Sequence, residues 1–217
     1  MTEHSEPSRA ATAVGAGHVT IRPSILYVGT PVMLIASQNP DGTTNLAAAS
    51  SYWALGQMLV IGLEDGGQTI DNVLALPELT VNFPQPELWE AVEAIGDTTG
   101  MSPVPAAKTP RYRHVADKFA AAGLTPQASE AVNPPRVAEC ALQLEAVVRR
   151  VTPGLGEYNL VEAEVTRVHA APEIVVPGTE HIDPRAWRPM IYSFRHYFGL
   201  GAEHGHRPTS DIAGRTT

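Results

Sequence analysis

Between residues 30 and 84, short apolar runs alternate with turn-forming residues, and this pattern predicts β-strands. The run Val32–Ser37 is closed by Asn39-Pro40-Asp41-Gly42, and an Asp-Gly pair readily supplies the positive φ angles of a tight hairpin turn. The return strand is predicted over Thr43–Trp53, where small residues stand at positions that are usually bulky. A further strand is predicted over Met58–Leu63.

The middle of the chain mixes helical and strand patterns. A glycine-bearing loop, Glu64–Gln68, leads into a short helix that is predicted to begin at Thr69, and a short strand follows over Thr80–Phe83. Apolar residues at helical spacing predict a helix over Pro86–Gly96, since proline suits the first helical turn. The same spacing predicts a second helix over Tyr112–Ala122.

Two longer segments of the second half alternate with period two. These segments, Ala138–Val148 and Tyr158–His169, are joined by Pro153–Gly156, and such a pair suits an antiparallel barrel wall with one solvated face. A short edge strand is predicted over His18–Pro23, because a proline would interrupt a central strand. The pattern as a whole predicts a mainly β fold with a few peripheral helices.

Length and charge restrict the number of domains and the classes of partner that the chain can have. With 217 residues and 43% hydrophobic residues, we expect one domain over residues 18–201, between a disordered N-terminal tail (1–17) and a flexible C-terminal tail (202–217). The net charge of −8 argues against nucleic acid and anionic membrane as partners, since both require a basic surface. Residues 1–17 lack the apolar core of a signal peptide, and no stretch could span a membrane, which favours a cytoplasmic location.

Neither the single cysteine nor the two C-terminal histidines forms a predicted chemical site. Cys140 is the only cysteine; it lies in an alternating segment that predicts a buried position, whereas a nucleophilic thiol requires a partly exposed, electropositive one. His204 and His206 have no nearby cysteine or acidic partner at a spacing typical of zinc, so no metal site is predicted.

The order of strand, turn, strand, strand, loop, short helix and strand resembles the flavin reductase-like family over roughly residues 25–201. The resemblance implies an FMN-binding split β-barrel, an antiparallel Greek-key barrel with a few peripheral helices. The positions that carry it are Pro31-Val32, Asp41-Gly42, Asn45-Leu46-Ala47 with Ser50, Thr69 with Asn72, Val81-Asn82, Arg188–Tyr192 and Tyr197–Gly201.

The helix that follows the glycine-bearing loop is the predicted phosphate site. A helix N-terminus favours an anion because its first N–H groups lack partners within the helix. By resemblance, Thr69 and Asn72 contribute side-chain donors to the phosphate of FMN; the alternative is that Thr69 caps the helix. Relatives often carry a basic residue at the position of Gln68. The sequence names no arginine that would replace it.

The segment Asn45–Ser51 is the predicted site of the flavin ring. A flat ring that bonds to backbone groups along its edge requires small side chains, and this segment supplies them. By resemblance, Asn45, Ala47, Ser50 and Ser51 flank the ring. The alternative is a barrel strand that is small because another strand approaches it closely.

The resemblance implies an FMN-dependent NAD(P)H:flavin oxidoreductase that acts as a homodimer and supplies reduced flavin to a partner monooxygenase. NADH or NADPH is the co-substrate, and no catalytic side chain is expected because the flavin itself carries the hydride. Arg195, His196 and Tyr197 are candidates for the nicotinamide face, and the alternative for them is a C-terminal clamp. Two other functions stay open, namely an FMN enzyme of the same fold with another organic substrate and a non-catalytic flavin-binding relative.

Overall fold

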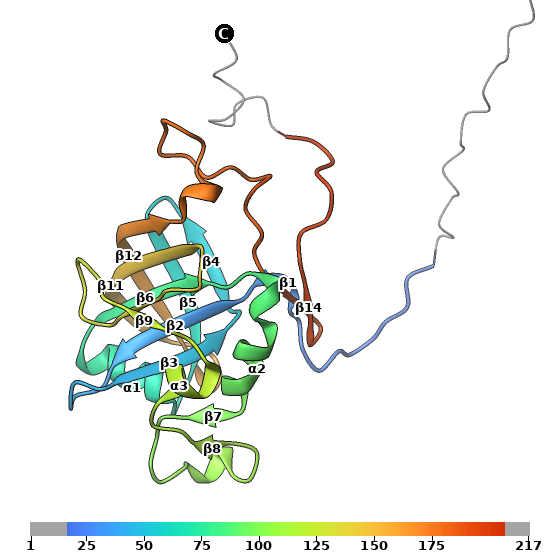
Figure 1. Ribbon diagram of the computed structural model, residues 1–217. Helices are drawn as coiled ribbons and strands as arrows, with labels where there is room; N and C mark the ends of the chain where they lie inside the picture. The colour runs from blue at the N-terminus through green and yellow to red at the C-terminus, as the bar shows by residue number, and fades with distance from the viewer. Residues whose placement is uncertain (1–16, 207–217) are drawn as a thin grey trace, which may run out of the picture.

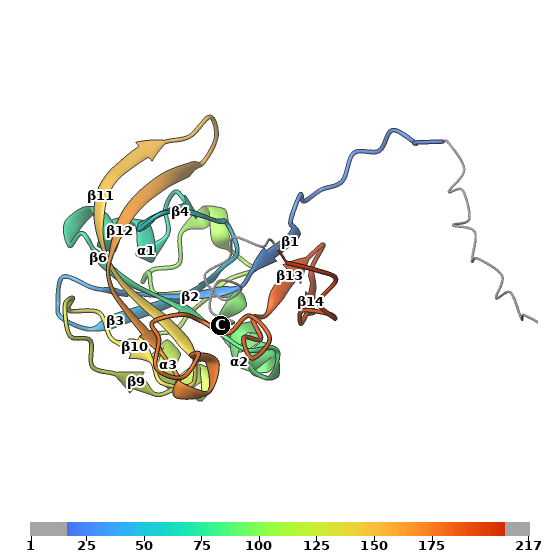
Figure 2. The same cartoon turned by 90° about the horizontal axis from the view of Figure 1, so that it is seen from above.

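The computed structural model describes residues 17–206 and is built around a seven-stranded antiparallel sheet (Figure 1). Neighbouring strands follow the order β3-β2-β6-β11-β12-β5-β4. Figure 2 shows how strongly the sheet curves, with the long β11–β12 ribbon rising from one side. The strands are β2 (Met33–Gln38), β3 (Thr44–Ala49), β4 (Tyr52–Leu55), β5 (Met58–Glu64), β6 (Glu78–Phe83), β11 (Leu142–Pro153) and β12 (Tyr158–Ala170).

Helices and short strands surround this sheet. α1 (Gln68–Ala75) connects β5 to β6, and α2 (Trp89–Gly96) follows β6 after a 3-10 turn, η1 (Pro86–Leu88). The remaining elements before β11 are β7 (Thr98–Thr99), η2 (Ala106–Lys108), β8 (Arg113–His114), α3 (Lys118–Ala122), β9 (Pro126–Gln127) and β10 (Arg136–Val137). After β12 come η3 (Pro172–Ile174), β13 (Ile191–Ser193) and β14 (His196–Phe198), and the last two form a small sheet with β1 (Val28–Pro31).

Both predicted hairpins are present. β2 pairs with β3 in antiparallel register from Met33 opposite Ala49 to Gln38 opposite Thr44, and Gly42 at the turn has a φ of +85°. β11 pairs with β12 along nearly its whole length. The prediction of a mainly β fold with few helices is thereby confirmed.

Two apolar clusters lie on opposite faces of the sheet. The inner cluster contains fully buried residues such as Ile35, Ile61 and Val81, each of which alternates with outward-facing neighbours along its strand. The outer cluster packs α2 and α3 onto β2 and β3 through residues such as Leu34 and Phe119. The helices therefore cover one face of the strands that carry the small-residue segment.

Four predicted boundaries were wrong. The return strand Thr43–Trp53 is two strands, β3 and β4, and β4 pairs with β5 instead of β2. The segment His18–Pro23 forms no strand. The second helix is confined to Lys118–Ala122, because Arg113–His114 pairs in parallel with β7. β11 begins at Leu142, later than the predicted Ala138.

Both chain ends of the described region leave the body of the molecule. Residues 17–24 run as an exposed, extended segment away from β1 (Figures 1 and 2). Residues 202–206 are exposed and without regular structure. The predicted tails otherwise lie outside the described residues. In the described part of the chain, no helix is long and apolar enough to cross a membrane.

Candidate functional site

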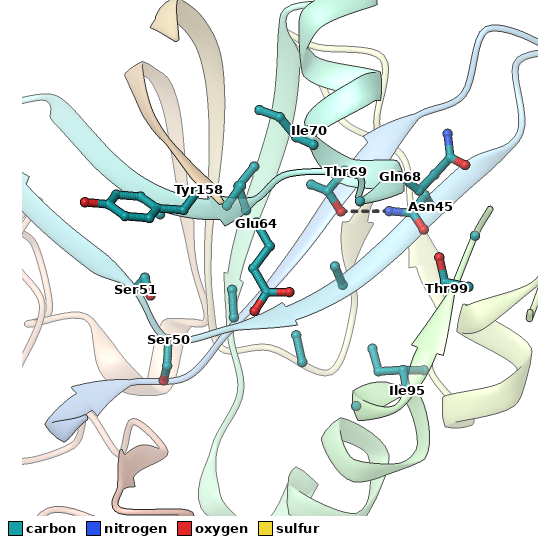
Figure 3. A pocket seen from close by; sticks show the side chains of 18 of the residues that line it. Asn45, Ser50, Ser51, Glu64, Gln68, Thr69, Ile70, Ile95, Thr99 and Tyr158 are labelled. Atoms are coloured by element: carbon teal, nitrogen blue, oxygen red, sulfur yellow. Dashed lines mark hydrogen bonds between the residues drawn. The ribbon is translucent and has the colours of Figure 1, made fainter. Parts of the chain in front are cut away.

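A cavity of about 740 Å³ opens beside the small-residue segment. Its volume lies within the range of small-molecule and cofactor pockets, roughly 300–1,000 Å³. One wall is formed by β3, β4, β5 and the start of α1, and the opposite wall by the end of α2 and the segment 98–118 (Figure 3). Five of the six predicted cofactor residues, Asn45, Ala47, Ser50, Ser51 and Thr69, line this one cavity.

The first turn of α1 faces one end of the cavity. Gly67 is the N-cap, and no side chain caps the helix, so the alternative that Thr69 acts as the cap does not hold. Instead, the Thr69 hydroxyl accepts a hydrogen bond of 3.0 Å from Asn45 Nδ2 (Figure 3). The first-turn N–H groups of a helix lack i−4 partners. They are therefore available to an anion at the edge of the cavity.

Two lysines line the same cavity, and they are the only lysines of the chain. Lys108 Nζ lies 3.4 Å from the position that a Cβ atom would occupy at Gly67, the N-cap of α1. Lys118 is 4% exposed and, among residues 17–206, has no hydrogen-bond or ion-pair partner. Burial, with a contribution from the neighbouring Lys108 charge, lowers the pKa of Lys118 to about 8. A buried, unpaired ammonium favours an anionic ligand.

Gly100 brings the opposite wall close to Asn45. A Cβ atom at Gly100 would lie 2.8 Å from Asn45 Oδ1 and 2.9 Å from Gln68 Cγ, so only glycine fits here without movement. Asn45 Oδ1 is itself buried without a hydrogen-bond partner. Buried acceptors are rarely left unpaired. This atom therefore suits a ligand that brings a hydroxyl or N–H donor, such as the ribityl chain of a flavin.

The small-residue segment forms the floor of the cavity. Ala47 and Ala48 contribute little more than backbone, which leaves room for a flat ring. Ser50 Oγ donates to the Pro31 carbonyl at 3.0 Å, so its hydroxyl proton is already used. Ser51 Oγ lies 2.9 Å from the Tyr27 hydroxyl, and this pair leaves one hydroxyl proton for a ligand. Of the two serines, Ser51 is thus the better donor.

Asn72 does not line the cavity. Its side chain is 1% exposed and lies behind the first turn of α1. It donates to Ser37 Oγ and Asn39 Oδ1, and it accepts from Gln68 Nε2 at 2.9 Å. These bonds tie α1 to the β2–β3 hairpin. The geometry therefore gives Asn72 a positioning role behind the predicted phosphate site.

The candidates for the nicotinamide face lie outside the cavity of the single chain. Arg195 and His196 are exposed at the β13–β14 turn, where Arg195 has a φ of +69°. The Tyr197 hydroxyl donates to the Glu93 carboxylate, and burial first, then this bond, raises the pKa of Tyr197. Tyr197 also packs on Tyr192, as the clamp alternative requires. The nicotinamide role of these three residues stays a prediction.

The carboxylates near α1 are only partly directed at the cavity. Glu64 projects from β5 into the space that it lines (Figure 3). Asp65 accepts a hydrogen bond from Asn159 Nδ2 and does not line the cavity. Asp71 is exposed on the far side of the first turn. Of these three carboxylates, only Glu64 lines the cavity; Glu157 lines it as well, so the two lysines share the lining with two carboxylates.

Exposed apolar side chains surround the mouth of the cavity. Trp53 and Leu55 project from β4 with 55% and 71% of their surfaces exposed, and Tyr158 and Leu160 project from β12, which β5 separates from β4. We name these four residues the apolar rim. Three of them, Trp53, Tyr158 and Leu160, also line the cavity. The site therefore opens onto a surface of the kind that proteins usually cover.

The cysteine and the second hollow of the described chain lie apart from the cavity. Cys140 is buried, as predicted, and burial raises the pKa of its thiol, so it is unsuited to nucleophilic chemistry. A second hollow beside it, with a volume of about 480 Å³, is lined by residues such as Arg136 and His169. In residues 17–206, no group of three His, Cys, Asp or Glu side chains could hold a metal ion.

Known structures share this architecture. The flavoredoxin of Desulfovibrio vulgaris (Miyazaki F) aligns with a TM-score of 0.72 at 18% identity, over 90% of this chain and 99% of that one. Nitrilotriacetate monooxygenase component B from Bacillus cereus aligns with a TM-score of 0.67 at 21% identity, over 85% and 89% of the two chains. A Shewanella frigidimarina protein with a split barrel domain aligns with a TM-score of 0.68 at 20% identity, over 84% and 87%. These likenesses confirm the predicted split β-barrel.

Sequence comparison identifies the family. Among curated proteins, the uncharacterized protein YdfE of Bacillus subtilis (strain 168) is 42% identical over 190 residues, which cover 85% of this chain and 90% of YdfE. The flavin reductase like domain matches residues 25–201, the span over which the motifs were recognised. The chain therefore belongs to the flavin reductase-like family, a family of flavin-dependent oxidoreductases.

Proposed function

We propose that this protein is an FMN-dependent NAD(P)H:flavin oxidoreductase. The observation that carries the proposal is the position of Lys108 and Lys118, the only lysines of the chain, which converge on the cavity beside the N-terminus of α1. A cavity with a cationic end and a floor of small residues suits a ligand that joins a phosphate to a flat ring. FMN has this form.

The residues of the cavity divide between the two ends of such a ligand. Lys108, Lys118 and the first-turn amides of α1 would hold the phosphate, with Thr69 and Asn45 next to them. Charge-assisted hydrogen bonds of this kind are stronger than neutral ones. The lysines thus take the place of the basic residue that Gln68 does not provide.

The ring would lie along Ala47–Ser51. Bound FMN would supply the hydride chemistry between NADH or NADPH and a second flavin. The chain would hold the ring along this small-residue segment and offer the Ser51–Tyr27 hydroxyl pair to its polar edge. No acid, base or nucleophile of the protein is required for this reaction.

A comparison of FMN with riboflavin tests the phosphate end. Each charge-assisted bond contributes about 1.5–3 kcal/mol, so Lys108→Met and Lys118→Met should each weaken FMN binding by about tenfold or more. Riboflavin lacks the phosphate, and its affinity should change little. Arg149→Met, which removes an exposed cation from β11, is the matched control. Equal losses for FMN and riboflavin would show that the lysines do not contact a phosphate.

Turnover separates the three candidate functions. For the reductase, we expect steady oxidation of NADH or NADPH in the presence of free FMN. FMN that binds but gives negligible NAD(P)H oxidation would favour an enzyme of the same fold with another organic substrate. A protein that leaves FMN fluorescence and absorbance unchanged on titration would contradict flavin binding itself.

We also propose that two copies of the chain form a homodimer through the apolar rim. Trp53 and Leu55 are large apolar side chains on β4, the edge strand of the sheet, and an exposed apolar edge is normally covered. Such a dimer would place the mouth of each cavity at the subunit boundary.

The reduced flavin would serve a partner monooxygenase in the cytoplasm, where NADH and NADPH are available. The likeness to nitrilotriacetate monooxygenase component B supports this part of the proposal only at the level of the fold. A coupled assay tests it: the purified protein should sustain a flavin-dependent monooxygenase that receives no other source of reduced flavin.

A further inference from the structure

Residues 17–26, which we name the arm, form an extended segment that is exposed except at Ile25, which is half-buried. In the described residues, the arm makes no backbone or side-chain hydrogen bond to any element. Val19 and Ile21 expose 83% and 71% of their surfaces, and Leu26 exposes 75%. Removing these apolar side chains from water would contribute about 25 cal/mol of stabilisation per Å² of apolar surface.

The sequence of the arm is that of a segment with one apolar side. In an extended chain, residues two apart point to the same side, so Val19 and Ile21 share one side while Thr20 and Arg22 share the other. The arm carries Arg22 and His18 and no carboxylate. It therefore suits a surface that is apolar and flanked by negative charge.

The apolar rim is such a surface. Its four residues are exposed, and Glu64 and Glu157 lie beside them in the lining of the cavity. In the described chain, neither carboxylate has an ion-pair partner. The rim and these two carboxylates complement the arm in both polarity and charge.

The root of the arm lies at the cavity. Tyr27, directly after the arm, lines the cavity and bonds through its hydroxyl to Ser51, while its ring packs against Tyr192 at a centroid distance of 5.4 Å. If the apolar rims of two copies meet around a two-fold axis, a segment that starts at the cavity mouth of one copy lies near the other copy. Ten extended residues span roughly 33 Å, which is enough to cross a cavity mouth.

We propose that the arm of one copy lies across the apolar rim of the second copy and covers the mouth of its cavity, so that the partner completes each flavin site. This inference rests on the homodimer proposed above. Besides contacting the second copy, the arm would exclude water from the flavin ring, because it covers the mouth of the cavity.

Cross-linking of full-length variants tests where the arm lies. Cys140 is buried and is the only native cysteine. Cross-links should therefore form almost entirely through the introduced cysteines. Ile21→Cys and Leu55→Cys chains are co-expressed, treated with a short bis-maleimide without flavin or nucleotide, and separated on a denaturing gel. We expect a covalent dimer that contains one chain of each kind, at a yield at least about tenfold above the control.

The control pairs Ile21→Cys with Val168→Cys. Val168 is exposed on β12, eight residues from Leu160, which is roughly 26 Å along the strand. Equal yields with Leu55→Cys and Val168→Cys, or cross-links only between two Ile21→Cys chains, would overturn the proposal. So would a monomeric wild type in sedimentation.

A binding measurement connects the arm to the site. Val19→Asp together with Ile21→Asp should raise the dissociation constant of FMN several-fold, because the covered mouth opens, while a Thr20→Asp variant on the opposite side should change it less. Unchanged FMN binding in the double variant would contradict the covering role. Wild-type protein that binds no FMN would overturn the proposed function, whereas the cross-linking result would still decide the position of the arm.

Discussion

Lys118 shows how a single residue trades stability for binding. Its side chain is nearly fully buried, yet nothing in the described chain neutralises it. Taking an unpaired ammonium out of water is costly, and the pKa of about 8 expresses that cost. A phosphate beside it would offset the cost, so we interpret the cost of burying Lys118 as the counterpart of affinity for an anion.

The protonation of Lys118 gives the site a pH dependence. Below pH 8 the ammonium is charged; above it, the amine is neutral and a phosphate loses an ion pair. If only the charged form binds well, the dissociation constant of FMN should rise about tenfold from pH 7 to pH 9. Fluorescence titration across this range checks it, with riboflavin as the ligand control.

Two further measurements test whether Lys118 is the group whose protonation controls FMN binding. Lys118→Met should show a flat profile for FMN over the same range; a profile as steep as that of the wild type would assign the titration to another group. Without flavin, the folded state binds fewer protons than the unfolded state between pH 8 and the ordinary lysine pKa of 10.5. The free energy of unfolding should therefore rise with pH in this window.

Thr69 and Asn72 should respond differently to removal. Thr69→Ala removes the hydroxyl that accepts from Asn45 inside the cavity, so FMN binding should weaken about fivefold, equivalent to roughly 1 kcal/mol. Asn72→Ala removes three side-chain hydrogen bonds, one buried and two partly buried, and should lower the free energy of unfolding by about 1–3 kcal/mol. Titration and urea denaturation of each variant check the division. The reverse pattern would place Asn72 at the phosphate.

At the scale of elements, the site depends on how closely β7 and its following turn approach β3 and α1. Gly100→Ala would place a Cβ atom 2.8 Å from Asn45 Oδ1 and 2.9 Å from Gln68 Cγ. Overpacking of this kind costs typically 1–3 kcal/mol, and both neighbours are at the predicted phosphate end. We expect FMN affinity to fall by about tenfold in a titration.

Gly96→Ala is the matched control for this variant. Gly96 also lines the cavity, but a Cβ atom there would meet nothing within 4 Å. Its FMN affinity should stay at the wild-type value. Equal losses in the two variants would show that the cavity tolerates no added methyl group anywhere, instead of a specific contact at Gly100.

The elements that the sequence predicted well are those with local causes. Asp41-Gly42 sets the β2–β3 turn, and period-two alternation sets β11 and β12. The second helix was predicted too long because the spacing of its apolar residues carries no information about pairing with a strand elsewhere in the chain. Arg113 N donates to the Asp97 carbonyl and Val115 N to Thr99, so this backbone is held in a strand, and the helix starts only after Asp117, its N-cap.

At the scale of the whole molecule, the cavity combines segments that are far apart in sequence. Lys108 and Lys118, which line the cavity beside α1, lie 41 and 51 residues downstream of Gly67. No local pattern marks a lysine as buried, because its position depends on where α3 packs against β3. For the same reason, the sequence supplied the small-residue floor and the helix of the site but left its cations unassigned.

The homodimer makes a prediction at this scale. Leu55→Asp would place a carboxylate in the proposed interface and should shift the protein toward monomers in sedimentation, because a charge buried without a partner is costly. Leu74→Asp, on the exposed side of α1, is the control and should leave the assembly unchanged. Leu55 does not line the cavity. A fully dimeric Leu55→Asp variant would move the interface elsewhere.

The distribution of lysines also has a practical consequence. Reagents that acylate primary amines, including the esters used to attach dyes or to immobilise proteins on sensor surfaces, find only two lysine side chains in this molecule. Both lie in the cavity, and Lys108 is the more accessible of the two. Apart from the terminal amine, labelling would thus occur at the site that the label is meant to report on. Coupling through an introduced surface cysteine leaves that site intact.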